Sequence, residues 1–161
     1  MKIADKINVS YVPFKHPATY VISGGTGSGK TFFLSNLLIN AEVTIDKPIQ
    51  RLVYCYGVYL KDTFALLKQH YPQIELISGI DGSLQFDSEV NNFLIFDDLM
   101  CDAVNSTVIR DYFTKGSHHK NISVILLTQN LYQQGSYSRT INYNTQYVVY
   151  FKNPRNESQV G

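Results

Sequence analysis

A glycine-rich segment carries the strongest chemical signal in the sequence. Residues 24–31 read GGTGSGKT and fit the pattern G-x-x-x-x-G-K-[ST] at every position. A phosphate group is bound where several backbone N–H groups converge, which requires residues without side chains in unusual dihedral angles. In such a loop Lys30 reaches the β- and γ-phosphates of ATP, and the Thr31 hydroxyl is a ligand for Mg²⁺. The predicted nucleotide-binding residues are Gly24, Gly25, Thr26, Gly27, Ser28, Gly29, Lys30 and Thr31.

A second candidate is a pair of carboxylates, Asp97 and Asp98, which directly follows the apolar run Phe93–Phe96. Carboxylates at the end of a buried strand are costly unless something uses them. Beside a phosphate loop, Asp97 would bind Mg²⁺ together with Thr31, and Asp98 would polarise or orient the attacking water. The alternative interpretation is a strand end followed by an acidic turn. Hydrolytic sites of this type often carry Glu at the second position, and Asp is one methylene shorter.

A third candidate is Gln129, in the polar stretch that follows the apolar run Val124–Leu127. A neutral amide at such a strand end can hydrogen-bond the attacking water or the γ-phosphate and so sense hydrolysis. A simple turn residue is the alternative. The next stretch, residues 131–139, is predicted to be a polar loop that contacts a sugar-phosphate backbone or only solvent.

The elements that must position these residues alternate along the chain. Apolar, β-rich runs without polar alternation are typical of strands buried on both faces, and they occur at Thr19–Ser23, Leu52–Tyr56, Ile74–Ile77, Phe93–Phe96, Ile122–Leu127 and Tyr147–Phe151. Helices are predicted at Thr31–Asn40, Asp62–His70 and Asp102–Lys115, with Asp62 and Asp102 as N-caps. This alternation predicts a doubly wound α/β domain with a mostly parallel central sheet and helices on both faces. Ligands of such sheets bind at the carboxyl ends of the strands.

Composition narrows the classes of protein. Of the chain's residues, 44% are hydrophobic and 17% are charged, a composition that excludes a disordered or fibrous protein. The length of 161 residues predicts one domain over 1–161, with an N-terminal arm at 1–12. The net charge of +1 provides no global attraction to nucleic acid or to an acidic membrane, so any DNA contact requires a local patch. No apolar run approaches the ~20 residues that span a bilayer, and a soluble intracellular protein is expected. Cys55 and Cys101 are predicted to be reduced thiols.

Two weaker features have open interpretations. The basic cluster Lys115–Lys120 contains adjacent histidines, His118 and His119. A metal site there would need further ligands, so we expect a loop at the edge opposite the nucleotide that contacts a subunit or DNA. Phe14, just before the first strand, is expected either to flank the adenine or to pack the N-terminal arm.

Four segments in this order and spacing carry a family resemblance: GGTGSGKT at 24–31, IFDD at 95–98, SHHKNISVILLTQN at 117–130 and RTIN…YVVYFKNPR at 139–155. Together they resemble the viral genome-packaging ATPases of the FtsK–HerA superfamily, above all those of large DNA viruses, virophages and self-synthesising transposons. The likeness extends from about Pro13 to Val160. The phosphate loop is shared by many NTPases, whereas the LTQN strand end and the FKNPR tail are more specific.

The resemblance implies a RecA-like P-loop ATPase domain that assembles into a pentameric or hexameric ring and drives double-stranded DNA into a preformed capsid. The implied partners are other copies of the chain, DNA and a capsid or portal protein, in the host cytoplasm, the nucleus or a viral factory, with a transient place on the virion. Such motors use an arginine of the neighbouring subunit. Of the four arginines here, Arg139 is the first choice, and Arg110 and Arg155 stay open.

Two other classes of function are compatible with the phosphate loop. A small nucleoside or nucleotide kinase would match the size of the chain, but it requires an arginine-rich lid that the four scattered arginines do not provide. A non-catalytic nucleotide-binding relic is the second alternative. The presence of Lys30, Thr31, Asp97 and Asp98 argues against it.

Overall fold

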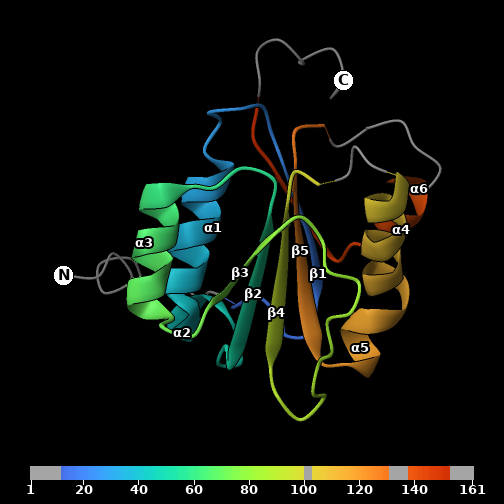
Figure 1. Ribbon diagram of the computed structural model, residues 1–161, viewed down its shortest axis with the longest axis horizontal. Helices are drawn as coiled ribbons and strands as arrows, with labels where there is room; N and C mark the ends of the chain where they lie inside the picture. Colours follow the sequence, from blue (N-terminus) through green and yellow to red (C-terminus); the bar gives the residue numbers. More distant parts are fainter. Residues whose placement is uncertain (1–11, 100–102, 131–137, 153–161) are drawn as a thin grey trace.

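A parallel sheet forms the centre of the computed structural model, which describes residues 12–99, 103–130 and 138–152 (Figure 1). Within these residues the sheet has six strands in the order β3-β2-β4-β5-β1-β6, and every neighbouring pair is parallel. The strands are β1 (Thr19–Ser23), β2 (Arg51–Tyr56), β3 (Glu75–Ser78), β4 (Asn92–Asp97), β5 (Ile122–Thr128) and β6 (Tyr147–Tyr150).

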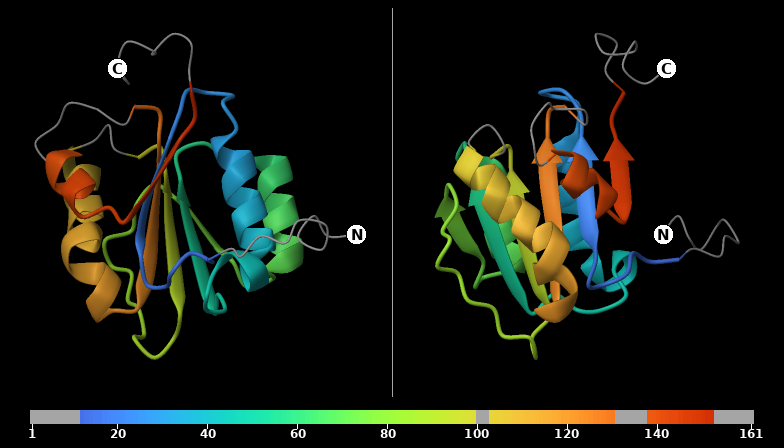
Figure 2. Two further views of the ribbon diagram at one scale, coloured as in Figure 1. Left: turned by 180° about the vertical axis from the view of Figure 1, so that it is seen from behind. Right: turned by 90° about the vertical axis from the view of Figure 1, so that its right-hand side faces the viewer.

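Helices cover both faces of this sheet (Figure 1, Figure 2). One face carries α1 (Lys30–Ile39), α2 (Ala41–Thr44) and α3 (Lys61–His70). The other carries α4 (Ala103–Asp111), the π-helical segment η2 (Tyr112–Gly116), α5 (Ser117–His119) and α6 (Ser138–Tyr143). The predicted doubly wound α/β architecture is therefore confirmed, with a sheet that is parallel throughout.

Two apolar clusters, one on each face, hold the layers together. Successive strand residues point to opposite faces, so Ile22 packs toward α1 and α3 whereas Val21 packs toward α4 and η2. The central strands are buried along nearly their whole length. Burial on both faces explains why these strands are apolar runs without polar alternation.

The predicted strands are confirmed to within one or two residues at their ends, and the predicted N-cap at Asp62 is wrong. Leu60 occupies that position, and α3 begins at Lys61. Asp62 instead lies in the first turn, where its carboxylate interacts favourably with the partial positive charge of the helix N-terminus. The other predicted N-cap, Asp102, lies outside the described residues, as does Cys101.

The predicted loop over Lys115–Lys120 is mostly helical instead. Helix α4 continues into η2 and then α5, which ends at His119, and β5 begins at Ile122. A Cβ on the buried Gly116 would lie 2.9 Å from Cδ1 of Tyr112, so the absence of a side chain there lets the turn close on the tyrosine ring. The cluster lies, as predicted, at the amino end of β5, opposite the phosphate loop.

None of the described helices could cross a membrane.

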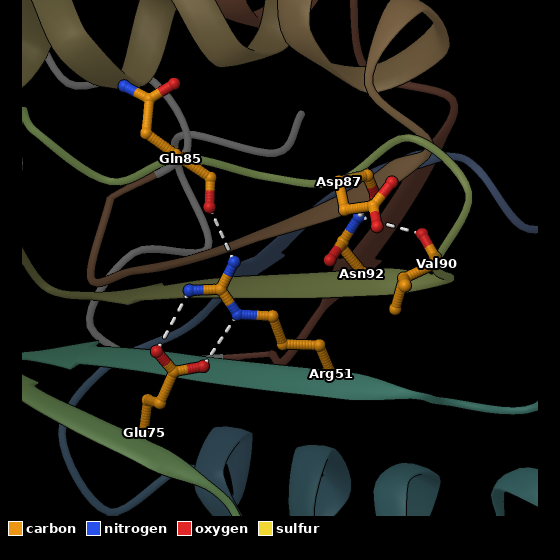
Figure 3. A network of polar contacts seen from close by, with 6 residues as sticks. All are labelled: Arg51, Glu75, Gln85, Asp87, Val90 and Asn92. Carbon is orange, nitrogen blue, oxygen red and sulfur yellow. Dashed lines mark hydrogen bonds and ion pairs between the residues drawn. The ribbon is translucent and has the colours of Figure 1, made fainter.

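A network of polar contacts lies at the amino edge of the sheet, where the strands begin (Figure 3). The Arg51 guanidinium donates hydrogen bonds of 2.7 and 2.9 Å to the Glu75 carboxylate and one of 2.6 Å to the Gln85 carbonyl oxygen. The Asn92 amide donates to the carbonyl oxygens of Asp87 and Val90. These contacts hold the long connection between β3 and β4 against the sheet, at the end away from the candidate site.

Candidate functional site

The phosphate loop, the acidic pair and Gln129 come together at the carboxyl edge of the sheet, the upper edge in Figure 1. Strand β5 lies between β1 and β4, and the register aligns Ile22, Leu127 and Asp97 on one rung. Because all three strands are parallel, the segments that follow them leave from the same edge. The strand order thus brings together residues that lie far apart in the sequence.

Glycine is required at particular positions of the phosphate loop. Gly27 has φ 75° and Gly29, which precedes α1, has φ 108°, in the left-handed region that favours glycine. At Gly24 there is no space for a side chain, because a Cβ there would lie 2.5 Å from Ser28 Oγ and 2.8 Å from Phe151 Cβ. The Gly24 N–H also donates a 3.1 Å hydrogen bond to the Thr128 carbonyl oxygen, which ties the loop to β5.

Lys30 is folded back onto this loop. Its ammonium group donates hydrogen bonds to the Gly24 carbonyl oxygen at 2.7 Å and to the Thr128 carbonyl oxygen at 3.3 Å. Burial lowers the pKa of Lys30, and the carboxylates of Asp98 and Asp97 oppose that shift. The cation is therefore held beside the loop in the field of both acids.

Asp97 ends β4 as a half-buried carboxylate. Burial raises the pKa of Asp97, whereas a hydrogen bond from the buried phenol of Tyr54 lowers it. That bond joins Tyr54 Oη to Asp97 Oδ2 over 2.7 Å. Sequence reasoning missed Tyr54. The signal was a tyrosine inside a buried apolar strand, because a buried phenol usually needs a hydrogen-bond partner.

Asp98 is exposed and has φ 58°, so its backbone is in the left-handed region. Its backbone N–H donates to the Leu127 carbonyl oxygen at 3.0 Å, and its Oδ2 accepts a 3.1 Å hydrogen bond from the Gln129 amide. Asp and Asn adopt this conformation several times more often than most other residues. The backbone therefore provides a physical reason for Asp, rather than Glu, at this position.

The residues around the loop fit a magnesium nucleotide. Ser28 Oγ is buried in the loop and has no hydrogen-bond partner, so a polar group remains there for a ligand. Thr31, the second residue of α1, supplies a hydroxyl oxygen, and Asp97 supplies a carboxylate oxygen. Oxygen donors of this kind are the ligands that Mg²⁺ prefers.

The candidate arginines differ in their surroundings. Arg139 is the second residue of α6, whereas the sequence predicted it at the end of a loop. Its side chain is exposed and makes no ion pair within the part of the chain that the structure describes. Arg110 is bound to Asp111 at 2.8 Å. Arg155 lies outside the described residues, together with residues 131–137 of the predicted polar loop and most of the predicted N-terminal arm.

Two aromatic residues near the chain ends have distinct positions. Phe14 does not reach the phosphate loop: its ring packs edge-on against Tyr20 and Tyr147 near the amino ends of β1 and β6. This placement favours packing of the N-terminal segment over contact with adenine. Phe151, which directly follows β6, packs against the loop at Gly24 and Gly29 instead and was missed by sequence reasoning.

Comparisons with known proteins support the fold. No protein-family model and no curated protein matches the sequence. The structure is similar to the flagellar accessory protein FlaH from Methanocaldococcus jannaschii, with a TM-score of 0.55 and 14% identity over 85% of this chain and 72% of that one. It is also similar to a KaiC-like protein from Pyrococcus horikoshii OT3, with a TM-score of 0.54 and 15% identity over 85% and 73% of the two chains. The cytoplasmic domain of EssC gives a TM-score of 0.57 and 16% identity over 89% of this chain, which spans 33% of that one.

At these identities the likeness establishes the fold. Together with the parallel sheet and the position of the phosphate loop, it defines a RecA-like P-loop NTPase fold. The strand inserted between β1 and β4 is the feature that places Gln129 next to the acidic pair.

Proposed function

We propose that this chain is a Mg²⁺-dependent ATPase that moves double-stranded viral DNA into a preformed capsid as a ring of identical subunits. The observation that carries the ATPase part is the convergence of the phosphate loop, Asp97, Asp98 and Gln129 at one sheet edge, with Gln129 hydrogen-bonded to Asp98. The motor part rests on the family resemblance of the four sequence segments.

Each residue of the site has a proposed role. Lys30, held by the Gly24 and Thr128 carbonyl oxygens, would neutralise charge on the β- and γ-phosphates. Thr31 and Asp97 would hold Mg²⁺, which supplies further charge neutralisation when bound. Asp98, exposed at the strand end, would orient the attacking water and accept its proton.

The remaining roles link the site to neighbouring subunits. Gln129 would orient the same water and change partners once the γ-phosphate has left. Arg139 is our first choice for the arginine supplied to the adjacent subunit, because its side chain is exposed and makes no ion pair within the described residues. Arg51 is a poorer choice, since Glu75 and Gln85 hold it at the opposite edge.

The net charge of +1 is compatible with a DNA motor of this kind. A ring repeats a few basic residues of each subunit around its axis, so a nearly neutral subunit can still form a positive channel. We therefore expect weak, salt-sensitive binding of DNA by the monomer. A capsid or portal protein is the expected second partner.

The test is ATP hydrolysis by the purified protein over a series of protein concentrations, with and without duplex DNA. A motor assembled from subunits should show specific activity that rises steeply with protein concentration and is stimulated by DNA. The Lys30→Ala variant should lose turnover, while Lys68→Ala, on the exposed side of α3, should keep it. ATP hydrolysis that depends neither on protein concentration nor on duplex DNA would contradict the DNA motor, although the chain would still be an ATPase. Transfer of phosphate to an added nucleoside, seen by thin-layer chromatography, would favour a kinase instead.

A further inference from the structure

Tyr54 is the buried partner of the Asp97 carboxylate. Its phenol O–H donates the 2.7 Å hydrogen bond to Oδ2, and its side chain is 0% exposed. The register pairs Tyr54 with Ile95, so Tyr54 and Asp97 both lie on the sheet face that α1 covers. This is also the face on which Lys30 and Thr31 begin α1.

Aromatic packing holds the Tyr54 ring in place. Phe64 of α3, itself fully buried, meets the ring edge-on with centroids 4.9 Å apart. Phe64 also packs against Tyr56 at 5.3 Å and Tyr59 at 5.0 Å. A ring locked by such neighbours presents its hydroxyl in one position, which is the condition for orienting a functional group accurately.

We propose that Tyr54 is a positioning residue that fixes the orientation of the Asp97 carboxylate toward a bound magnesium nucleotide, an inference that rests on the proposed function. A carboxylate has two oxygens that can act as ligands. Tyr54 engages Oδ2, so Oδ1 is the oxygen that remains for Mg²⁺. Hydrogen-bond partners of metal ligands commonly determine ligand orientation and affinity in this way.

The Tyr54 phenol is the donor in its hydrogen bond to Asp97. Burial, and then the negative charge of Asp97, raise the pKa of Tyr54 far above its ordinary value of 10.0. Tyr54 therefore carries no charge of its own beside the carboxylate. It offsets part of the cost of burying Asp97 without competing for the cation.

The test compares Tyr54→Phe with wild type by electron paramagnetic resonance of Mn²⁺, titrated in the presence of ADP. The substitution removes only the hydroxyl, so we expect about a tenfold loss of Mn²⁺ affinity. Affinity for ADP in the presence of a chelator should not change. In hydrolysis assays, the Mg²⁺ concentration for half-maximal rate should rise by a similar factor, while kcat at saturating Mg²⁺ should fall less.

Tyr20→Phe is the matched control. Tyr20 is also buried, and its hydroxyl donates to the Lys15 carbonyl oxygen at 3.1 Å, at the other end of β1 from the phosphate loop. This variant should bind Mn²⁺ as wild type does. In an Asp97→Asn background, Tyr54→Phe should have no further effect on Mn²⁺ affinity.

The outcomes separate the positioning role from the proposed function. If wild type binds Mn²⁺ with ADP and Tyr54→Phe binds it equally well, the positioning role is wrong. An equal loss in Tyr20→Phe would also overturn it, because the effect would then follow from general destabilisation. If wild type binds no nucleotide at all, the proposed function is wrong, and the positioning role of Tyr54, which depends on it, is wrong as well.

Discussion

The side-chain amide of Gln129 donates a 3.1 Å hydrogen bond to Oδ2 of Asp98, joining the ends of β5 and β4. Both side chains are exposed at the edge where the phosphate loop lies. In the proposed ATPase this bond couples the residue that senses the γ-phosphate to the residue that activates water. A change of partner at Gln129 would then alter the orientation of Asp98 directly.

The first prediction concerns Gln129→Ala. Loss of one aligned hydrogen-bond donor from a catalytic site typically lowers turnover by roughly 10²-fold, and we expect a fall of that order in ATP hydrolysis. Nucleotide affinity should change little, because the phosphate loop is intact. Gln73→Ala, an exposed glutamine before β3 at the amino edge, serves as control and should keep full activity. Equal activity of the two variants would exclude Gln129 from the catalytic set.

The second prediction uses the left-handed backbone of Asp98. Asn is tolerated at φ 58° at least as well as Asp, so Asp98→Asn should fold normally, bind ATP and lose about 10²- to 10⁴-fold in hydrolysis. Asp98→Glu keeps the charge but places a longer side chain on an unfavourable backbone, at a cost of about 1–2 kcal/mol in unfolding free energy. Calorimetry and ATPase assays separate the two effects. A fully active Asp98→Asn variant would show that Asp98 is not the base.

Much of this site could be predicted because its signals are local. The residue types of 24–31 encode the loop, and apolar runs encode the buried strands. Tyr54 could not be predicted as a partner of Asp97, since the two lie on different strands and only the strand order brings them together. The helix that carries Arg139 was also missed, because the segment before it reads as a polar loop.

Two expectations about the ends of elements were wrong. Asp62 matches the preference of an N-cap, yet Leu60, which packs against the core, occupies that position and the helix begins at Lys61. The basic cluster that includes Lys115 contains Gly116, which suggests a break, but Gly116 is the buried last residue of the π-helical segment and lies next to the Tyr112 ring. In both cases the observed helix departs from the local preference of the sequence, which is a weak guide to the ends of elements.

The third prediction tests the space around Gly24. Gly24→Ala places a Cβ within 3 Å of Ser28 Oγ and Phe151 Cβ, so the loop must shift. We expect nucleotide affinity to fall at least tenfold and the unfolding free energy to fall by about 1–3 kcal/mol, as for other overpacked sites. Gly82→Ala is the matched control, because a Cβ there meets nothing within 4 Å. Isothermal titration with ADP measures both variants, and unchanged affinity in Gly24→Ala would contradict the loop geometry.

A buried histidine at the amino edge is the basis of the fourth prediction. His16 is 4% exposed, with Nδ1 2.6 Å from Ser123 Oγ and Nε2 3.0 Å from Asn121 Oδ1. Because Asn121 Oδ1 can only accept, Nε2 carries the proton and Nδ1 accepts from the Ser123 hydroxyl. Ser123 Oγ in turn accepts from the Ala18 N–H, which completes a network for the neutral ring.

Burial lowers the pKa of His16 below its ordinary value of 6.5. Between this lowered pKa and about pH 6.5, the unfolded chain therefore binds more protons at this position than the folded chain does, and the contribution of His16 to the unfolding free energy falls as the pH falls. We expect His16→Gln to lose about 1–3 kcal/mol at pH 7, since its hydrogen bonds are disturbed, but to show a shallower decline between pH 7 and 5. Urea unfolding across this range measures both slopes, and parallel curves would mean that His16 is protonated equally in the folded and unfolded states.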